Sequence, residues 1–335
     1  MKKFIITSIL SSLICVASFG QSTMFRTILS HGGQLTQYNL NNWTDALTDA
    51  VDGDTIYFTP GTFPGDITIT KKIVLIGAGV CESQTWYHGE TSMQDALGGS
   101  GTPSSNSTNI NGNISIELDD NPTLTATMLE GLNIHNTVTI NKTVTDLKIK
   151  RCQIGNVRTN VYDVSTESAK PKYLRLESCY IHELHAGNFD TPIIYNCYIT
   201  YANLYSQPFS FTNCSIDYTY NSVGCNYINC LLHDDSYAGI NTYLNCIYCN
   251  YLNNGSTYTN CWTYDAGDGT RPWNWSKSYL TENSYFGDDG TVIGPLGGQA
   301  PFTFIPSQPY ISTSSVAYDA STKKLNVNIT VKKGK

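Results

Sequence analysis

The chain of 335 residues is acidic, because 20 lysines and arginines stand against 27 aspartates and glutamates, giving a formal net charge of −7 at pH 7. Like-charge repulsion disfavours nucleic acid, anionic membranes and acidic polymers as partners. Glycine, asparagine, serine, threonine and tyrosine are abundant and no long heptad pattern is present, which favours a single elongated all-β domain.

The first twenty residues have the pattern of a secretory signal peptide. Lysines at positions 2 and 3 precede an apolar run over residues 4–19, and Gly20 precedes Gln21. We therefore expect residues 1–20 to be removed and the protein to be exported to the periplasm, the cell surface or the medium. Beyond Gly20 no apolar stretch approaches the roughly 20 residues that span a bilayer, so no transmembrane segment is predicted.

A short helix is expected at residues 42–51, after an N-terminal lead-in over residues 21–41. Its apolar positions follow the helical period and would suit the capping of an exposed solenoid end. These positions are Trp43, Ala46, Leu47, Ala50 and Val51. The chain then continues with DGDTIYFTPGTFPGDITITKKIVLIGAG over residues 52–79.

A repeated pattern, apolar-x-apolar-x-x-Cys-x-apolar, runs through the middle of the chain, as in Leu174, Leu176, Cys179 and Ile181. Its alternation on both sides of a two-residue interruption predicts two short strands joined by a bend. Asparagine tolerates a left-handed backbone better than most residues and suits such a bend. It occupies the interruption at positions 196, 213, 229, 245 and 260.

The spacing of the cysteines predicts the architecture. Cysteines recur at positions 152, 179, 197, 214, 230, 246 and 261, at intervals that shorten from 27 to 15 residues. Such intervals are too short for β-α-β crossovers and match the coils of a parallel β-solenoid with an interior cysteine column. Parallel Cβ vectors give the wrong torsion for a bridge, so we expect reduced cysteines, with disulfides as the alternative in an oxidising compartment.

Residues from about Trp43 to about Tyr264 resemble the pectin-lyase-like superfamily of right-handed parallel β-helix proteins. In that family a helix precedes a Gly-Asp-Thr-Ile strand, a Pro-Gly-x-Phe/Tyr turn and an Ile-x-Leu-Ile-Gly coil, and residues 42–79 are similar to this opening. The resemblance implies a single-stranded right-handed parallel β-helix over residues 42–300. It implies little about activity, because members include lyases, hydrolases and proteins without known catalysis.

The tail over residues 301–335 differs from the coils. It begins with prolines, continues with the expected strand LNVNITV and ends with basic residues. It resembles the ending of other secreted bacterial β-helix proteins. We expect a short β tail that caps the last coil, with surface sorting as the alternative role.

Catalysis as a polysaccharide lyase or a glycoside hydrolase is the alternative that the fold invites. Lyases of this family commonly use lysine, arginine or Ca²⁺, yet no lysine or arginine occurs between Glu177 and Thr270. The acidic clusters, Asp234–Asp235 and Asp265 with Asp268, lack the surrounding motifs of a hydrolase. A lyase site in the early coils stays open, with the basic residues Lys142, Lys148, Lys150, Arg151, Arg158, Lys170, Lys172 and Arg175.

One column of polar residues is a candidate catalytic site. Asp217, His233 and Cys249 each follow a repeat cysteine by three residues, so they should lie on three successive coils. A carboxylate, an imidazole and a thiol in this order could activate the thiol, although a polar turn column without chemistry is the alternative. Cys246-x-x-Cys249 and His182-x-x-His185 lack the spacing of known metal sites, so no metal or cofactor is predicted.

Aromatic and acidic residues of the later coils are candidates for glycan binding, because aromatic rings stack on sugars while amide and carboxylate groups bond hydroxyls. The candidates are Tyr201, Tyr218, Trp262, Trp273, Trp275, Asp234 and Asp265. We expect a secreted or cell-surface β-helix protein that binds a neutral polysaccharide or surface glycan, or serves structurally, without demonstrable catalysis.

Overall fold

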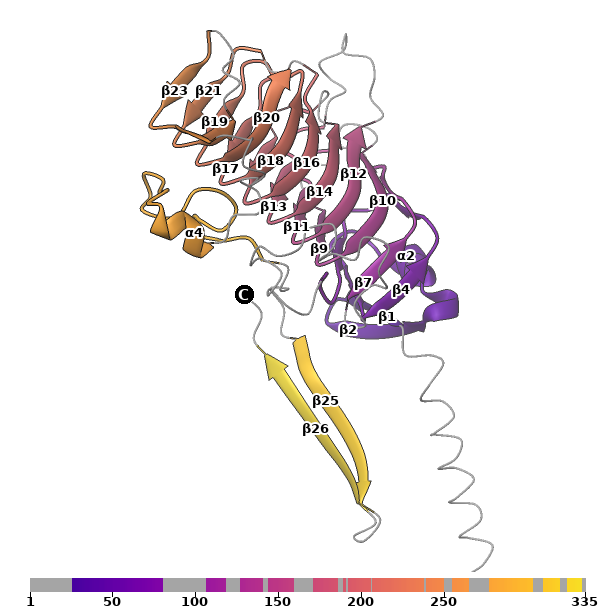
Figure 1. Ribbon diagram of the computed structural model, residues 1–335. Helices are drawn as coiled ribbons and strands as arrows, with labels where there is room; N and C mark the ends of the chain where they lie inside the picture. The colour runs from indigo at the N-terminus through magenta and orange to yellow at the C-terminus, as the bar shows by residue number, and fades with distance from the viewer. Residues whose placement is uncertain are drawn as a thin grey trace, which may run out of the picture.

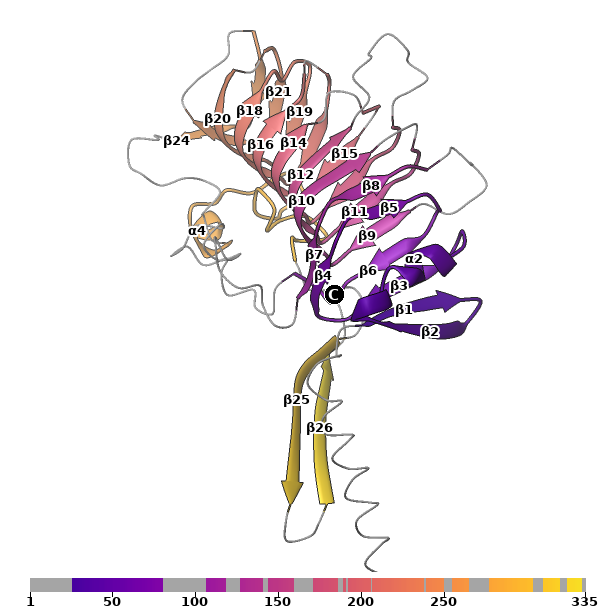
Figure 2. The same cartoon turned by 90° about the vertical axis from the view of Figure 1, so that its right-hand side faces the viewer.

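The protein folds as a stack of coils that form two long, mostly parallel sheets (Figures 1 and 2). This arrangement confirms the predicted all-β solenoid with parallel coils. The computed structural model describes residues 26–80, 107–118, 127–140, 144–159, 171–185, 189–190, 192–205, 207–237, 239–249, 255–264, 277–303, 310–319 and 324–332.

The first sheet, called sheet A, contains one short strand from each coil. Strand β1, within the predicted lead-in, pairs antiparallel with both β2 and β3 at the N-terminal edge, and every pair from β3 onward is parallel. In spatial order the strands are β2 (Gln34–Asn39), β1 (Arg26–His31), β3 (Thr55–Phe58), β6 (Val74–Ile76), β9 (Met128–Glu130), β11 (Lys148–Lys150), β13 (Arg175–Glu177), β15 (Ile193–Tyr195), β17 (Ser210–Thr212), β19 (Asn226–Ile228), β21 (Thr242–Leu244) and β23 (Thr257–Thr259).

The second sheet, called sheet B, contains the longer strands of the middle coils and is parallel throughout its described pairs. In spatial order its strands are β4 (Gly61–Pro64), β7 (Thr108–Asn111), β10 (Asn133–Ile140), β12 (Gln153–Thr159), β14 (Tyr180–His185), β16 (Tyr198–Asn203), β18 (Ser215–Tyr220), β20 (Leu231–Tyr237), β22 (Ile247–Cys249) and β24 (Trp262–Tyr264). Strands β5 (Ile67–Ile69) and β8 (Ile114–Ile116) pair with each other, and β8 also pairs with β10.

From strand β9 onward, a left-handed residue connects sheet A to sheet B in each described coil. Asn196, Asn213, Asn229, Asn245 and Asn260 have φ between 48° and 53°, as their predicted place in the bend requires. The corner is built differently in earlier coils, where Gly131, Arg151 and Ser178 adopt the same left-handed backbone. Asparagine suits the later corners because its short amide tolerates this conformation and hydrogen-bonds locally.

From Arg151 onward, each of these corner residues is followed by a cysteine. The six cysteines from Cys152 to Cys246 in this column are fully buried, and no disulfide forms among the described residues. Their thiols donate to backbone carbonyls, as Cys230 does to Ile228 at 3.2 Å and to Phe211 of the preceding coil at 3.5 Å. The thiols therefore satisfy the corner backbone while they pack as small apolar groups.

The helix predicted near the N-terminus is present but shorter than expected. Helix α2 spans Asp45–Asp49 and follows a 3₁₀ turn, η1, at Leu40–Asn42. Trp43, Ala46 and Ala50 are buried as predicted, and the Trp43 ring meets Phe58 edge-on at 6.1 Å. Val51 is exposed because the backbone is already extended at Ala50.

Residues 277–303, called the return segment, run back along the outside of sheet B toward earlier coils. The segment begins with helix α4 (Lys277–Glu282). Tyr285 contacts Trp262 of the last coil at 5.7 Å, whereas Phe302 contacts Tyr198 at 4.9 Å. Between these ends, Gly294 donates its amide to the Asn229 carbonyl at 2.8 Å. The segment therefore lies antiparallel to the order of the coils.

A second apolar core joins the return segment to sheet B. It consists of Leu231, Ile247, Tyr264, Leu280, Val292 and Ile293. Nearer the N-terminus, the Asn196 side-chain amide donates to the Pro295 carbonyl at 3.1 Å and the Gly297 carbonyl at 2.9 Å. The corner asparagines thus serve both the bend and the attachment of this segment.

The predicted tail strand LNVNITV is present as β26 (Lys324–Lys332). It pairs antiparallel with β25 (Tyr310–Asp319), and the two strands form a sheet of their own. Strands β23 and β24 end sheets A and B, and the hairpin pairs with neither of them. Both views show the hairpin apart from the coils (Figures 1 and 2). No helix within the described ranges is long and apolar enough to cross a bilayer.

Candidate functional site

The outer side of sheet B has a bulge with two rows of side chains, of which Thr200 and Asp217 are buried. Between the buried residues Ile181 and Leu184, and again between Ile199 and Ala202, two consecutive residues point away from the core. The first residues of these pairs form one row, called the histidine row, with His182, Thr200, Asp217 and His233. The second residues form the tyrosine row, with Glu183, Tyr201, Tyr218 and Asp234, which pair in register across strands β14, β16, β18 and β20.

The histidine row contains two of the predicted catalytic residues. Asp217 is 3% exposed, and its Oδ1 lies 4.0 Å from Nε2 of His233 on the next coil. That distance suits an ion pair with a protonated imidazole but is longer than a hydrogen bond. The coils therefore place the carboxylate and the imidazole next to each other, as their spacing in the sequence predicts.

Tyr264 is the third member of this cluster. Its hydroxyl contacts Nδ1 of His233 and donates to the His233 carbonyl at 3.3 Å. Cys249, the predicted third residue, pairs with Tyr264 between strands β22 and β24, but its side chain lies outside the described residues. Tyr264 thus reaches back across the coil of Cys249, so that a phenol meets the imidazole where a thiol was expected.

The two candidate tyrosines lie with their rings stacked on each other. The Tyr201 and Tyr218 rings are 5.1 Å apart and nearly parallel, at 11°. The His182 ring meets Tyr201 edge-on at 5.4 Å, and the His233 ring meets Tyr218 edge-on at 5.9 Å. Each tyrosine ring thus contacts one tyrosine ring and one histidine ring, and both tyrosines are half-buried. The binding of sugars by these two tyrosines stays a prediction.

A polar chain extends the tyrosine row toward earlier coils. Glu183 Oε2 accepts from Asn156 Nδ2 at 2.8 Å and lies 3.2 Å from His185 Nε2. The other nitrogen of His185, Nδ1, lies 3.3 Å from the exposed Tyr205 hydroxyl. In the sequence, His185 stands out only within a rejected metal motif, and nothing marks Glu183 or Tyr205. Coil register was the available signal for Glu183, which pairs with Asn156, whereas Tyr205 lies beyond the paired residues of β16.

Among the remaining glycan candidates, only the side chain of Trp262 is described, and it lies outside both rows. Trp262 contacts Tyr285 of the return segment and packs against the second core, so it has a structural partner. The backbone of Asp234 lies in β20 opposite Tyr218, but its side chain lies outside the described residues. Asp265, Trp273 and Trp275 also lie outside the described residues.

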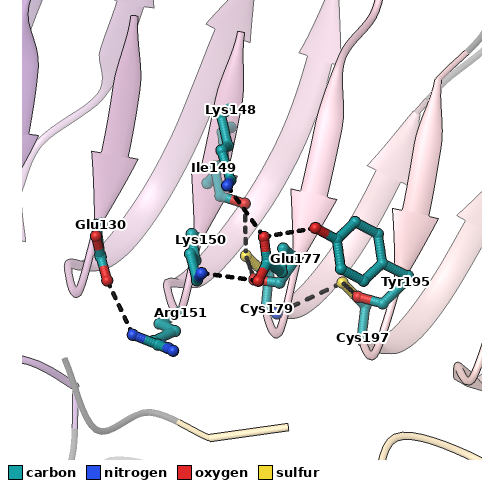
Figure 3. Close-up of polar contacts among 9 residues, drawn as sticks. All are labelled: Glu130, Lys148, Ile149, Lys150, Arg151, Glu177, Cys179, Tyr195 and Cys197. Carbon is teal, nitrogen blue, oxygen red and sulfur yellow. Dashed lines mark hydrogen bonds and ion pairs between the residues drawn. The ribbon is translucent and has the colours of Figure 1, made fainter. Parts of the chain in front are cut away.

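Three of the basic residues considered for a lyase site take part in ion pairs at strand β11 of sheet A and the corner that follows it (Figure 3). Lys150 Nζ and Lys148 Nζ lie 2.8 Å and 3.2 Å from the carboxylate of Glu177, which is 5% exposed. Arg151 pairs with buried Glu130 at 3.1 Å on the neighbouring corner. Three of the expected cations are thus held by buried carboxylates, while Lys142 and Lys170 lie outside the described residues.

Glu177 is held in its charged form. Burial alone would raise its pKa, but hydrogen bonds from Lys150 and from Tyr195 at 2.6 Å, together with the charges of Lys150 and Lys148, lower the pKa to about 2. The hydrogen bond between Glu177 and Tyr195 has the opposite effect on the tyrosine. Burial and the neighbouring carboxylate raise the pKa of the Tyr195 phenol. These shifts indicate a structural ion cluster with a permanently ionised centre.

The cysteines of the column differ in the direction of their pKa shifts, and at Cys230 burial is outweighed by hydrogen bonds with Cys214 and Cys246, which lower the pKa. Burial raises the pKa of Cys152, Cys197, Cys214 and Cys246. Cys261 in the last coil is only partly buried, and a hydrogen bond from Cys246 lowers its pKa to about 7. Among the described residues, no group of three or more histidine, cysteine, aspartate or glutamate side chains is arranged to hold a metal ion.

Comparison of the chain with protein-family models, with curated proteins and with solved structures finds no match, and the resemblance to the pectin-lyase-like superfamily stays a prediction.

Proposed function

We propose that the protein is an exported β-helix that binds a neutral glycan through the histidine and tyrosine rows, without catalysing its breakdown. One observation carries this proposal: hydroxyl, imidazole and carboxylate groups repeat in register over successive coils on one half-buried outer face. Such a face offers a polyhydroxyl chain hydrogen-bond donors and acceptors at steps of about 4.8 Å.

The charge of the site supports a neutral ligand. No lysine or arginine occurs between Glu177 and Thr270, which covers both rows from Tyr180 onward. Glu183 and Asp217 would repel an acidic glycan, since like charges interact unfavourably at this range. A neutral polysaccharide needs no compensating cation and can bond the tyrosine edges directly.

The described geometry gives less support to hydrolysis. Glycoside hydrolases place two carboxyl groups about 5–9.5 Å apart on either side of the scissile bond. Asp217 is almost fully buried behind the imidazole of His233, and Glu183 is already bonded by Asn156 and His185. Binding without turnover therefore fits these side chains better.

We also propose the handedness of the solenoid and a cap at its N-terminal end. The solenoid is right-handed, as the resemblance implies, and the segment of Trp43 and helix α2 covers its N-terminal end. The edge-on contacts of Trp43 with Phe58 and with Phe63, at 5.7 Å, support this covering role.

The test is a glycan array with the mature protein, joined to an assay for unsaturated and reducing-end products. The double variant Tyr201→Phe with Tyr218→Phe keeps the stacked rings and removes both hydroxyls. At about 0.5–1.5 kcal/mol per hydrogen bond, it should weaken binding roughly tenfold. Tyr173→Phe, which changes an exposed tyrosine in the turn before β13, is the matched control and should bind normally.

Unchanged binding by the double variant would exclude this face as the site. Product formation by the unmodified protein would replace the binding proposal with catalysis. A circular dichroism spectrum identical to that of the parent shows that a loss of binding does not come from unfolding.

A further inference from the structure

The later strands of sheet A carry an outer face without charges, called the flat face. It consists of the outward residues of β17, β19, β21 and β23, which are Ser210, Thr212, Asn226, Ile228, Thr242, Leu244, Thr257 and Thr259. Protein surfaces usually intersperse lysine, arginine, aspartate and glutamate. Four neighbouring strands without any of these residues are therefore unusual in a chain with a net charge of −7.

The side chains beneath the flat face indicate that its neighbouring strands are hardly rotated against each other. Phe211 stacks on Tyr227 at 5.2 Å and 5°, Tyr227 on Tyr243 at 5.0 Å and 7°, and Tyr243 on Tyr258 at 4.7 Å and 3°. Neighbouring strands in ordinary sheets are rotated by roughly 20–25°. Rings that remain parallel within a few degrees indicate that successive coils are translated with little rotation. The outward residues above them thus lie on a flat, regular grid.

The grid alternates two kinds of group. One row, Ser210, Asn226, Thr242 and Thr257, is exposed and can hydrogen-bond. The parallel row, Thr212, Ile228, Leu244 and Thr259, carries a methyl group at every position and is exposed or half-buried. Neighbours within a row are about 4.8 Å apart, and the rows are separated by two residues, about 6.6 Å, along the strands.

This pattern restricts the chemistry of a partner. The absence of charge excludes ionic recognition, and the outward positions carry no aromatic ring, because the rings of these strands point inward. Hydroxyls fix water by hydrogen bonds, while methyl groups beside them order the water around apolar surface. A flat grid of both groups would hold a first layer of water at regular positions.

We propose that the flat face binds ice. The ordered water held by its hydroxyl and methyl rows would join the crystal lattice, so that the protein adsorbs to the ice surface and opposes its growth. The face lies on the other sheet from the histidine and tyrosine rows, so this activity is independent of glycan binding. Both surfaces can be occupied on one molecule.

The experiment measures thermal hysteresis and inhibition of ice recrystallisation with the mature protein. The double variant Thr242→Lys with Thr257→Lys puts two charged, mobile side chains into the exposed row and should lose both activities. Thr68→Lys places the same substitution on an exposed position of β5, away from the flat face, and should retain them. Urea denaturation should give the same midpoint for all three proteins, because these threonines are exposed.

Absence of hysteresis and of recrystallisation inhibition in the parent protein would overturn the proposal, and so would equal activity in the double variant. Co-sedimentation with insoluble crystalline polysaccharide provides a further outcome. If the parent binds that solid, shows no ice activity and loses binding on Thr242→Lys with Thr257→Lys, the face is a polysaccharide surface and the ice proposal is wrong. Loss of glycan-array binding in Tyr201→Phe with Tyr218→Phe reports only on sheet B.

Discussion

The two halves of sheet A share one backbone design and present opposite surfaces. In the early half, β11 and β13 turn Lys148, Lys150, Arg175 and Glu177 outward over aliphatic interior residues. In the later half, β17 to β23 turn hydroxyl and methyl groups outward over stacked aromatic rings. The difference shows that the coil register determines the positions of the outward side chains but not their chemical type. Function in this molecule must therefore be inferred from surface rows, because one fold supports unrelated sites.

The two halves also differ in what holds neighbouring coils together. The early half uses ion pairs that cross coils, with Glu177 bonded to Lys150 and Lys148 of the preceding coil and Tyr195 of the next. The later half uses ring stacking and asparagine amides, such as Asn245 Nδ2 donating to Asn229 Oδ1 at 3.0 Å. The early half should therefore respond to pH and salt, and the later half to loss of packing.

The largest effect is expected from Tyr227→Ala, in the centre of the aromatic stack. Tyr227 is fully buried between Phe211 and Tyr243, so the change should lower the free energy of unfolding by about 3–5 kcal/mol. Urea denaturation followed by circular dichroism measures the loss. Hydrogen exchange should show weakened protection in β17 to β23 and little change in β11 and β13. A uniform loss over both halves would contradict separate stabilisation, and Tyr227→Phe is the conservative control.

A somewhat smaller and pH-dependent effect is expected from Glu177→Gln. The pKa of Glu177 is depressed from its ordinary 4.5 to about 2, so its contribution is complete above pH 4.5 and is lost as the pH falls toward 2. Linkage sets this contribution on the order of 3 kcal/mol. Parent and variant should differ most at neutral pH and converge near pH 2 in denaturation curves. A constant difference over that range would show that another group controls the acid response.

The smallest effect is expected at the corners. Asn229→Ala should cost about 1–2 kcal/mol, because alanine tolerates the left-handed backbone poorly and cannot accept the Asn245 bond. Asn229→Gly should cost less. At the equivalent early corner, Gly131→Ala should cost more, because its Cβ would meet the Gly77 carbonyl oxygen at 3.1 Å. Thermal midpoints of the three variants measure this order, and an equal cost for Ala and Gly at position 229 would remove the backbone explanation.

The coils were predictable because their signals are local and repeat. The cysteine intervals set the register, which in turn aligned Asp217 with His233 on adjacent strands. The left-handed corners followed from the positions of the asparagines, although Arg151 and Ser178 gave no comparable signal. The pairing of strands from successive coils could thus be derived from the spacing of the cysteines along the sequence.

Side-chain direction and the return segment could not be derived in this way. Register does not determine that Tyr264 leans across a coil to His233, or that two histidine rings meet Tyr201 and Tyr218 edge-on. The return segment has no repeat of its own, so its contacts with Tyr198, Leu231 and Trp262 are not encoded as a pattern. These contacts determine which candidate residues are already occupied.

The return segment also changes the mechanics of the solenoid. A stack in which each coil contacts only its neighbours can open one coil at a time from a free end. Residues 277–303 instead connect the last coil to coils several steps earlier, through Tyr285 on Trp262, Gly294 on Asn229 and Phe302 on Tyr198. The segment therefore holds together coils that are not neighbours. Force or a protease acting at the C-terminal end must first detach this segment before any coil can separate from the stack.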